Sequence, residues 1–400
     1  MIKLEQLIKE LCPNGVEYKT LGDIAIDIYR GSGIERKQIT STGTPCVRYG
    51  EIYTTYGIWF DKCFSHTNAS TISNPKYFEH GDILFAITGE SIEDIAKSCA
   101  YVGSDRCLAG GDIVVLKHNQ NPKYLSYALS TTKAKIQKSK GKVKSKVVHS
   151  SVPDIGKIVI PIPPLPVQNE IVRILDNFAE LTAELTAELT ARKKQYEYYR
   201  NELLLANGNK KQLLLGDIGR VAMCKRIMKS ETSKEGDVPF FKIGTFGKEP
   251  DAYITQEKFE EYRLNYSFPK KGAVLISAAG TIGRTVIYDG LPAYYQDSNI
   301  VWLENDESIV LNKYLFYYYQ LQPWAVSTGG TIARLYNDNI VKAKIEVPAI
   351  EEQERIVAIL DRFDALCNDL TSGLPAEIVA RQKQYEYYRD KLLTFREKVV

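Results

Sequence analysis

The sequence predicts an α+β protein in which two mixed α/β domains stand in tandem, each followed by a long helix. Three observations lead to this prediction. The chain repeats itself with a period of about 190 residues, each repeat opens with short apolar runs separated by Gly, Asn and Pro, and each repeat closes with a long amphipathic segment. At 400 residues the chain is long enough for two or three domains. We expect the two long helices to pair as an antiparallel coiled coil with pseudo-twofold symmetry.

The repeat is clearest at the end of each half. Residues 194–200 read Lys-Gln-Tyr-Glu-Tyr-Tyr-Arg, and this heptapeptide returns letter for letter at 383–389. Upstream of each heptapeptide, 163–178 and 348–363 share the pattern Pro-x-x-x-x-Gln-x-x-Ile-Val-x-Ile-Leu-Asp-x-Phe. Agreement over so many positions indicates that the chain contains two copies of one design.

The leading ~140 residues of each half are typical of a mixed α/β domain. Runs such as Gly81–Ile87 and Ile300–Leu303 predict strands, and the segments near Pro122–Lys138 and Leu311–Gln320 predict helices. Weaker matches extend the repeat into these domains: Leu21 to Ile24 with Leu215 to Ile218, Pro45 with Pro239, Arg48 with Lys242, and Gly50 with Gly244. The two domains are therefore expected to share a fold while differing in most of their surface residues.

Both trailing segments carry apolar or aromatic residues at intervals of three and four, which predicts helices of about 40 residues. The first seam is Ile171, Ile174, Phe178, Leu181, Leu185, Leu189, Tyr196, Tyr199 and Leu203. The second seam is Ile356, Ile359, Phe363, Leu366, Leu370, Leu374, Ile378, Tyr385, Tyr388 and Leu392. Pro375 follows Gly373, so we expect the second helix to kink or restart there. Such helices cannot bury a seam alone, and packing of each on its own domain is the alternative to mutual pairing.

These patterns divide the chain into five segments. They are an N-terminal helix within 1–16 that packs near the C-terminus, a first domain at 17–163, a central helix at 164–206, a second domain at 207–347 and a C-terminal helical segment at 348–400.

The central helix contains a four-residue repeat of its own. Residues 179–191 read Ala-Glu-Leu-Thr three times and then Ala, and three of these four residue types in each unit are strong helix formers. From Phe178 to Gln195 there are 17 steps, whereas the matching interval from Phe363 to Gln384 has 21. The difference of four residues equals one Ala-Glu-Leu-Thr unit, so we expect this stretch to tolerate the insertion of four residues at a time.

The distribution of charge is more informative than the net charge of +3. No acidic residue occurs between Asn121 and Pro153, and the lysines of this span are Lys123, Lys133, Lys135, Lys138, Lys140, Lys142, Lys144 and Lys146. Lysines at nearly alternate positions predict an extended or looped segment held against a polyanion, where each neutralised phosphate releases counterions. A solvated basic loop without a ligand is the alternative.

Sequence patterns of catalysis are missing. There is no Gly-x-x-x-x-Gly-Lys-Ser/Thr loop, no His-Glu-x-x-His pair and no Cys-x-x-Cys pair. The Asn-Pro-Lys-Tyr segments at 74–77 and 121–124 resemble the Asn-Pro-Pro-Tyr loop of amino-methyltransferases, but neither follows a glycine-rich turn for the methyl donor, and we expect both to be turns. We expect no catalytic or metal site, no membrane segment and a cytoplasmic location.

Two variable domains, each ending in the shared pattern and followed by the heptapeptide, resemble the specificity subunits of type I restriction-modification systems. The resemblance covers essentially the whole chain. It implies that each domain is a target-recognition domain reading one half of a bipartite, asymmetric site on double-stranded DNA through the major groove. It also implies that the helices set the gap and dock two methyltransferase subunits, which restriction subunits then join.

The same resemblance implies a non-catalytic chain that binds no cofactor. The assembled complex would be a DNA adenine methyltransferase and ATP-dependent endonuclease, with S-adenosylmethionine, ATP and Mg²⁺ bound by the partner subunits.

Base edges are read by Arg, Lys, Asn, Gln, Ser or Thr, while further basic side chains contact phosphates. The expected DNA-binding residues are Arg30, Arg36, Lys37, Lys140, Lys142, Lys144, Lys146, Lys225, Arg226, Lys229, Arg284, Thr331 and Arg334. The expected partner-docking and spacer residues are Tyr196, Tyr199, Arg200, Tyr385, Tyr388 and Arg389.

Two other functions are compatible with the sequence. A DNA adenine methyltransferase with a diverged donor site would bind S-adenosylmethionine by itself. A stand-alone DNA-binding regulator would not co-purify with a methyltransferase subunit, and it would not need the repeated heptapeptide.

Overall fold

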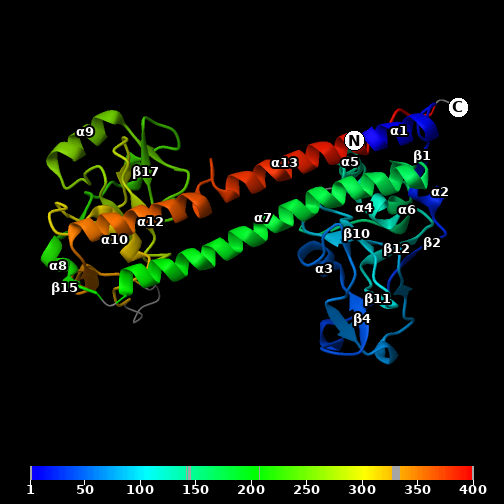
Figure 1. Cartoon of the computed structure of the whole chain (residues 1–400), viewed down its shortest axis with the longest axis horizontal. Helices are drawn as coiled ribbons and strands as arrows, with labels where there is room; N and C mark the ends of the chain where they lie inside the picture. Colours follow the sequence, from blue (N-terminus) through cyan, green and yellow to red (C-terminus); the bar gives the residue numbers. More distant parts are fainter. Residues whose placement is uncertain (1, 141, 143–145, 207, 327–333, 399–400) are drawn as a thin grey trace. The chain divides into compact units, whose positions relative to one another are not determined.

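The structure, a computed structural model, describes residues 2–140, 142, 146–206, 208–326 and 334–398. It forms two compact units: unit 1 contains Met1–Thr186 and Ile378–Val400, and unit 2 contains Ala187–Glu377. Each unit holds one mixed α/β domain together with parts of the long helices (Figure 1). The predicted fold class is therefore confirmed. None of the described helices is both long enough and apolar enough to cross a bilayer.

Two five-stranded sheets form the body of the domain in unit 1, in the orders β2-β12-β8-β10-β5 and β3-β6-β4-β11-β7. The strands of the first are β2 (Asp27–Arg30), β12 (Ile113–Lys117), β8 (Ile83–Ala86), β10 (Ser98–Tyr101) and β5 (Trp59–Phe60). Those of the second are β3 (Ile39–Thr40), β6 (Ser65–Thr67), β4 (Thr44–Val47), β11 (Cys107–Ala109) and β7 (Tyr77–Phe78). The strand β8 is apolar at every position because both of its faces are buried.

The domain in unit 2 has the same plan with fewer strands, in the orders β16-β22-β19-β20 and β18-β17-β21. Their bounds are β16 (Val221–Met223), β22 (Ile300–Leu303), β19 (Val274–Ser277), β20 (Thr285–Ile287), β18 (Tyr253–Ile254), β17 (Val238–Phe241) and β21 (Tyr294–Tyr295). The central register also agrees, since Leu84 lies opposite Val115 in unit 1 and Leu275 lies opposite Trp302 in unit 2. The weak sequence matches thus mark equivalent strands.

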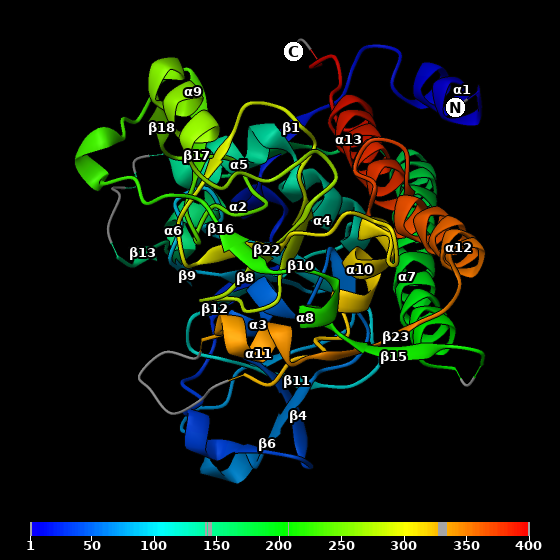
Figure 2. The ribbon, with the colours of Figure 1, turned by 90° about the vertical axis from the view of Figure 1, so that its left-hand side faces the viewer.

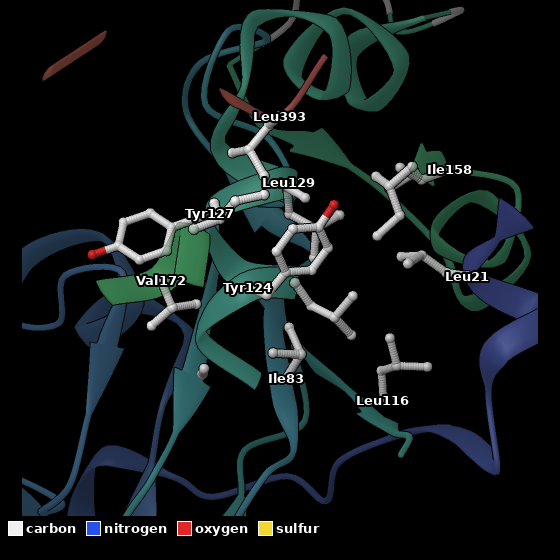
Figure 3. Packing of buried hydrophobic residues seen from close by; sticks show 14 of the residues in the cluster. Leu21, Ile83, Leu116, Tyr124, Tyr127, Leu129, Ile158, Val172 and Leu393 are labelled. Carbon is white, nitrogen blue, oxygen red and sulfur yellow. The ribbon is translucent and has the colours of Figure 1, made fainter. Parts of the chain in front are cut away.

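A buried helix joins each sheet to the long helices. In unit 1 this is α4 (Pro122–Ser130), whose Tyr124 and Tyr127 lie among Ile83 and Leu129 in the main core (Figure 3). The Tyr124 hydroxyl donates to the Pro161 carbonyl at 2.9 Å, and the Tyr127 hydroxyl donates to the Asp176 carboxylate at 2.7 Å. Buried tyrosines are therefore satisfied by polar partners that also fix the helix position.

The same arrangement recurs in unit 2 on α10 (Asn312–Tyr319). Tyr314 donates to the Glu346 carbonyl at 2.7 Å, and Tyr317 donates to the carboxylate of Asp361. Burial and the hydrogen bond to this carboxylate raise the pKa of Tyr317 well above its usual value, so the phenol stays protonated as the donor.

A buried glutamine fixes the start of each long helix. The helix α7 (Leu165–Leu205) contains Gln168, whose side chain donates to the Pro163 carbonyl at 2.7 Å and accepts from the Asn121 N–H at 3.0 Å. In α12 (Ile350–Asn368), Gln353 donates to the Pro348 carbonyl at 2.9 Å and accepts from the Leu311 N–H at 2.9 Å. These hydrogen bonds attach the start of each long helix to its domain, which explains why the proline-to-glutamine spacing is repeated.

The long helices pair within each unit through equivalent aromatic contacts. In unit 1, Phe178 of α7 stacks on Tyr388 of α13 (Leu374–Leu392) with ring centroids 5.4 Å apart. In unit 2, Tyr199 of α7 stacks on Phe363 of α12 at 5.8 Å. Phe178 matches Phe363 in the repeat and Tyr199 matches Tyr388, so both contacts join the same two positions. In unit 1 the phenylalanine comes from α7, and in unit 2 it comes from α12, as antiparallel pairing requires.

The seam prediction is wrong for three of its leucines, and Tyr199 is also 42% exposed despite its stack on Phe363. Leu181, Leu366 and Leu370 are largely exposed. Leu370 lies in the interruption between α12 and α13, where the helix stops at Asn368 and restarts at Leu374, as the Gly-x-Pro sequence predicted. The four extra residues of the second half are therefore taken up by this interruption and do not lengthen a continuous helix.

The helix α1 (Ile2–Leu11) packs on the core of unit 1, close to the end of α13 (Figure 2). Its Lys3 forms a 3.0 Å ion pair with Glu170 of α7. Beyond the helix, the Val16 N–H donates to the Arg396 carbonyl at 2.8 Å, so a segment near the end of the chain runs beside one near its start.

Replacing Gln353 with Ala leaves the Leu311 N–H and the Pro348 carbonyl without their partner. We expect the free energy of unfolding to fall by about 1–3 kcal/mol, the cost of unsatisfied buried polar groups. Urea denaturation of Gln353→Ala and Gln168→Ala measures it, with the exposed Gln382→Ala as the control. Equal stability of Gln353→Ala and the control would contradict this role.

Candidate nucleic-acid interface

A concave surface with basic side chains lies between the two sheets of the first domain. It is a cavity of about 580 Å³ lined by Arg30, Gly33, Ile34, Arg48, Tyr49, Gly50, Glu51, Thr54, Gly110, Gly111 and Asp112. Arg30 comes from the end of β2, and Arg48 follows β4 directly and precedes α3 (Tyr49–Thr54). Both arginines therefore lie where a strand ends, Arg30 on the partly exposed β2 and Arg48 after the buried end of β4.

The second domain has a cavity in the corresponding place, with a volume of about 630 Å³. Its lining includes Arg226, Ile227, Met228, Lys229, Thr232, Ser233, Lys234, Phe240, Lys242, Asp251, Gln296 and Asp297. We call the two cavities the first and second concave surfaces. Four basic side chains face two carboxylates on the second, so it carries a net positive charge.

Backbone contacts establish that the two concave surfaces are equivalent. The Arg48 N–H donates to the Glu51 carboxylate at 3.0 Å, three residues ahead, and the Lys242 N–H donates to the Thr245 hydroxyl at 3.1 Å, also three residues ahead. The preceding residue in each case accepts a backbone hydrogen bond from the strand alongside, Val47 from Gly110 and Phe241 from Gln296. Arg48 and Lys242 thus occupy one structural position.

The pairing of the basic groups differs between the domains. On the first concave surface, Arg30 forms an ion pair with Asp112 at 2.6 Å and Arg48 one with Glu51 at 3.3 Å. The Arg48 Nε atom is buried and has no hydrogen-bond partner among the described residues. A donor left over at a cavity wall can be satisfied by a base edge or a phosphate.

On the second concave surface, Arg226 pairs with Asp297 at 2.9 Å and Lys242 with Asp251 at 2.8 Å. Lys229 and Lys234 are exposed. These two lysines supply the net positive charge of this surface.

The remaining predicted DNA-binding residues of the domains are spread more widely. Arg36 and Lys37 are exposed on one short helical turn, where Lys37 pairs with Glu35. Lys225 lies over the Tyr266 ring at 5.1 Å. Arg284 and Arg334 are partly buried and donate to the Phe246 carbonyl at 2.8 Å and to Ser298, respectively, so both have structural partners. Thr331 lies outside the described residues.

The prediction of an extended lysine-rich segment is wrong for its first part, whereas the helical structure predicted near Pro122–Lys138 is confirmed as α4 and α5. Lys133, Lys135 and Lys138 lie on the helix α5 (Thr132–Ser139), because Thr131 caps a new helix by accepting from the Ala134 N–H at 3.3 Å. Of the four lysines assigned to DNA, Lys140 and Lys146 are exposed.

Lys142, in contrast, forms a 2.7 Å ion pair with Asp154, an acid just beyond the acid-free span. It is therefore already paired within the domain. Lys144 lies outside the described residues.

Lys138 is the exceptional lysine of this segment, since it is only 7% exposed. Its ammonium group donates to the Ser98 hydroxyl at 3.2 Å and lies 5.8 Å from the Phe85 ring centroid. Burial lowers its pKa to about 7. A charge in this position costs folding free energy, so Lys138 is part of the core and does not contribute to a surface for DNA.

The repeated heptapeptides divide into buried and exposed residues. Tyr196 is buried and donates to Gln320 at 3.0 Å, as does Arg200. Arg389 is also buried, and Tyr385 packs edge-on against Tyr127. These residues stabilise the helices within each unit. Tyr199 and Tyr388 contribute to the aromatic stacks, so the predicted docking residues already make contacts inside the chain.

The most exposed tyrosines of the two heptapeptides are Tyr198 and Tyr387, at 60% and 61% exposure. The sequence reasoning missed them because a heptad seam assigns them to the solvent side, where an aromatic residue needs no partner. Arg48, Lys234 and Lys242 were also missed. For Arg48 and Lys242 the signal was present, since they match within the repeat as a conserved positive charge.

Within the described part of the chain, no group of three or more His, Cys, Asp or Glu side chains is arranged to hold a metal ion.

The comparison with protein families identifies the chain. The model named Type I restriction modification DNA specificity domain matches residues 13–192 and again 207–380. The chain belongs to this family of specificity subunits. Its two matches fall on the two halves of the repeat, one for each domain with its helix.

Curated relatives agree with the assignment to specificity subunits. The chain is 56% identical over 263 residues to a putative type I restriction enzyme specificity subunit of Haemophilus influenzae, covering 64% of this chain and 68% of that one. It is 36% identical over 259 residues to the EcoR124I/EcoR124II specificity subunit of Escherichia coli, covering 60% and 63%. The chain thus spans a little under two thirds of the latter's length.

Solved structures confirm the specificity-subunit fold. A chain from a study of complex assembly and conformational transition of the type I R-M system aligns over 96% of this chain and 98% of its own, with a TM-score of 0.65 at 20% identity. The S subunit from M. genitalium aligns over 95% and 96%, with a TM-score of 0.52 at 14% identity.

Lys138→Met should raise the free energy of unfolding near pH 7. The amine has its usual pKa of about 10.5 in the unfolded chain and a lower one when folded, so between these values the unfolded state binds more protons and stability rises with pH. The advantage of the variant is therefore largest at and below pH 7 and shrinks towards pH 10. Urea denaturation at several pH values measures it, with the exposed Lys135→Met as the control. A difference independent of pH would count against a charged, buried Lys138.

Proposed function

We propose that this chain is the sequence-specific DNA recognition subunit of a type I restriction-modification complex. Each domain reads one half of a bipartite, asymmetric site in the major groove of double-stranded DNA. The helices set the unread gap between the half-sites and dock two methyltransferase subunits.

The observation that carries the proposal is the contrast between the two halves. The helix starts share a buried glutamine and partly exposed aspartate and phenylalanine positions in both halves, which suits contact with two copies of one partner. The concave surfaces occupy equivalent positions but carry different side chains, with Arg30 and Arg48 on one and Lys229, Lys234 and Lys242 on the other. Two different reading surfaces on equivalent supports are what a target with two unlike half-sites requires.

The chain itself is proposed to be non-catalytic and to bind no cofactor. In the assembled complex, adenine methylation would take place on the methyltransferase subunits with S-adenosylmethionine, and restriction subunits would supply ATP- and Mg²⁺-dependent cleavage. An adenine methyltransferase in this chain alone would instead bind S-adenosylmethionine, and a stand-alone regulator would bind DNA without a methyltransferase partner. Two measurements distinguish the three functions: whether the purified chain binds S-adenosylmethionine, and whether it forms a complex with a type I methyltransferase subunit.

The second concave surface offers a direct test of DNA contact. Lys229→Gln with Lys234→Gln should weaken DNA binding of the reconstituted complex and reduce the slope of log affinity against log salt by roughly one for each lost phosphate contact. Fluorescence anisotropy at several salt concentrations measures both. Lys270→Gln with Lys271→Gln removes the same charge from another exposed part of the domain, and it should leave the slope unchanged. If the two double variants behave alike, DNA does not contact the second concave surface.

The four-residue repeat of α7 is proposed to be part of the gap-setting device. It lies inside a helix that runs unbroken from Leu165 to Leu205. Within it, the Thr182 hydroxyl donates to the Phe178 carbonyl at 2.9 Å and the Thr186 hydroxyl to the Thr182 carbonyl at 2.8 Å. Each threonine is thus satisfied on its own helix, so the number of units can change without leaving a polar group unpaired.

Deleting Thr182 to Leu185 shortens the helix by roughly 6 Å and turns its continuation by about 40°. Since a DNA base pair rises about 3.4 Å, the gap should shorten by about one to two base pairs while both half-sites stay the same. Genome-wide mapping of methylated sites measures it, with Thr182→Ala and Leu185→Ala at full length as the control. An unchanged gap, or changed half-site bases, would show that α7 does not set the spacing.

A further inference from the structure

Arg48 has unused hydrogen-bond donors on the wall of the first concave surface. Its side chain lines the cavity and is 35% exposed. Among the described residues, its guanidinium group makes one hydrogen bond, to Glu51 at 3.3 Å, and its Nε atom is left without a partner. An arginine offers five N–H donors, so most of the donors of Arg48 are available to a ligand that presents acceptors at this wall.

Glu51 holds the Arg48 side chain in place. This glutamate is only 6% exposed, and its carboxylate accepts from the Arg48 backbone N–H at 3.0 Å and from the hydroxyl of the buried Ser65 on β6. The carboxylate is thus fixed from two sides before it contacts the guanidinium group. An arginine that is already oriented loses less side-chain freedom when it binds a ligand, so more of its hydrogen-bond energy is available for recognition.

Gly110 keeps the space beside Arg48 open. It lines the same cavity, and its N–H donates to the Val47 carbonyl at 2.8 Å. A Cβ atom at this position would lie 2.9 Å from the Val47 carbonyl oxygen and 3.3 Å from the Cα atom of Arg48, so a side chain would crowd the backbone that carries the arginine. The equivalent residue of the second domain, which donates to the Phe241 carbonyl at 2.9 Å, is Gln296. The open approach is therefore a feature of the first domain.

The charge balance of the first concave surface favours a base edge over a phosphate. Its lining holds two basic and two acidic side chains, so its formal charge is zero: Arg30, Arg48, Glu51 and Asp112. Each arginine is paired with one of the carboxylates, at 2.6 Å for Arg30 and at 3.3 Å for Arg48. A phosphate that approaches this surface meets carboxylates as well as arginines, whereas the edge of a base is uncharged and forms hydrogen bonds without this repulsion.

The shape of a guanidinium group selects among the bases. In the major groove, guanine presents two neighbouring acceptors, O6 and N7, which match two parallel N–H groups of an arginine. Adenine and cytosine each present an amino donor, and thymine presents a single acceptor beside a methyl group. At the equivalent positions of the second domain, Lys242 has a compact ammonium group in place of the planar fork, and Thr245 replaces the carboxylate. An oriented fork is therefore found at this position in the first domain and not in the second.

We propose that Arg48 is the residue with which the first domain reads a guanine of its half-site, and that Glu51 is a positioning residue for this contact. The inference rests on the proposed function for the presence of DNA at this surface, and it deepens that function by assigning one side chain to one base.

The test uses the full chain in complex with a type I methyltransferase subunit, and it maps methylated sites genome-wide. Arg48→Gln removes the fork and the charge. Arg48→Lys removes the fork but keeps the charge, so it also decides the question if Arg48→Gln fails to fold. Arg106→Gln is the control, because Arg106 lies in the same domain, pairs with Glu79 at 3.1 Å and lies outside the lining of the cavity. Thermal unfolding establishes that each variant is folded.

Wild type and Arg106→Gln should methylate the same bipartite site. Arg48→Gln should accept further base pairs at one G·C position of one half-site and leave the other half-site unchanged. In competition binding, the preference for G·C at that position should fall about ten- to a hundredfold, while the slope of log affinity against log salt stays the same. Arg48→Lys should lie between wild type and Arg48→Gln at the same position.

Glu51→Gln tests the positioning role. The amide keeps the shape of the side chain but removes its charge, so the surface gains one positive charge and Arg48 is held less firmly. We expect a smaller preference for guanine at the same position, together with tighter binding of non-specific DNA and a steeper dependence of affinity on salt. Equal loss of affinity for all DNA sequences would show a purely structural role and would overturn the assignment of Glu51.

Unchanged half-sites in both Arg48 variants, or relaxation at an A·T position, would overturn the inference and leave the proposed function intact. Arg48→Gln would also overturn it by weakening the binding of all sequences equally and lowering the salt slope by about one, since this is the behaviour of a phosphate contact. A wild-type complex that binds DNA without sequence preference would overturn the proposed function itself, and the inference with it.

Discussion

The structure depends on the fact that each long helix needs the other half of the chain to bury its apolar surface. In proteins, an amphipathic helix gains most of its stability from the packing of its apolar face and less from helix propensity. In unit 1 the start of α7 is covered by the end of α13, and in unit 2 the end of α7 is covered by α12. The helices contact each other through two equivalent stacked aromatic pairs, Phe178 with Tyr388 and Tyr199 with Phe363. Each half therefore contributes residues that bury part of the long helix of the other.

This dependence explains why sequence identity is so uneven along the repeat. Positions that join a domain to its long helix are constrained from both elements. Asp176 of α7 illustrates this, because it accepts from Tyr127 at 2.7 Å and pairs with Lys123 at 2.8 Å, both on α4, and Asp361 has the corresponding tyrosine and lysine in Tyr317 and Lys313. Loss of either aspartate leaves the hydroxyl of a buried tyrosine without its acceptor. The charged side chains of the concave surfaces, such as Arg30 and Arg226, are largely exposed, so their replacement leaves no buried polar group unsatisfied.

The sequence was sufficient for the elements that depend on local pattern. The period of apolar residues predicted α7, Gly373 and Pro375 predicted the restart of the last helix, and continuous apolar runs predicted β8 and β22. The sequence was insufficient for residues whose pairing or burial depends on a partner distant in the chain. Lys142 read as a free cation until Asp154 proved to lie beside it, and Lys138 is buried although its neighbours in sequence are all polar. A count of lysines along the chain contains no information about which of them find a partner.

The candidate site shows the same limit in a different form. Arg30 and Arg226 were predicted as DNA-binding residues because arginine is one of the residue types that read base edges, but their pairing with Asp112 and Asp297 could not be read from sequence. These ion pairs matter for function, because an arginine must give up its partner, or bring it along, to contact a base. A carboxylate beside the arginine disfavours the approach of phosphate while still accepting a hydrogen bond from cytosine. In the proposed complex the paired arginines would be better suited to discriminate between bases, and Lys229 and Lys234, which have no ion-pair partner among the described residues, to hold the DNA backbone.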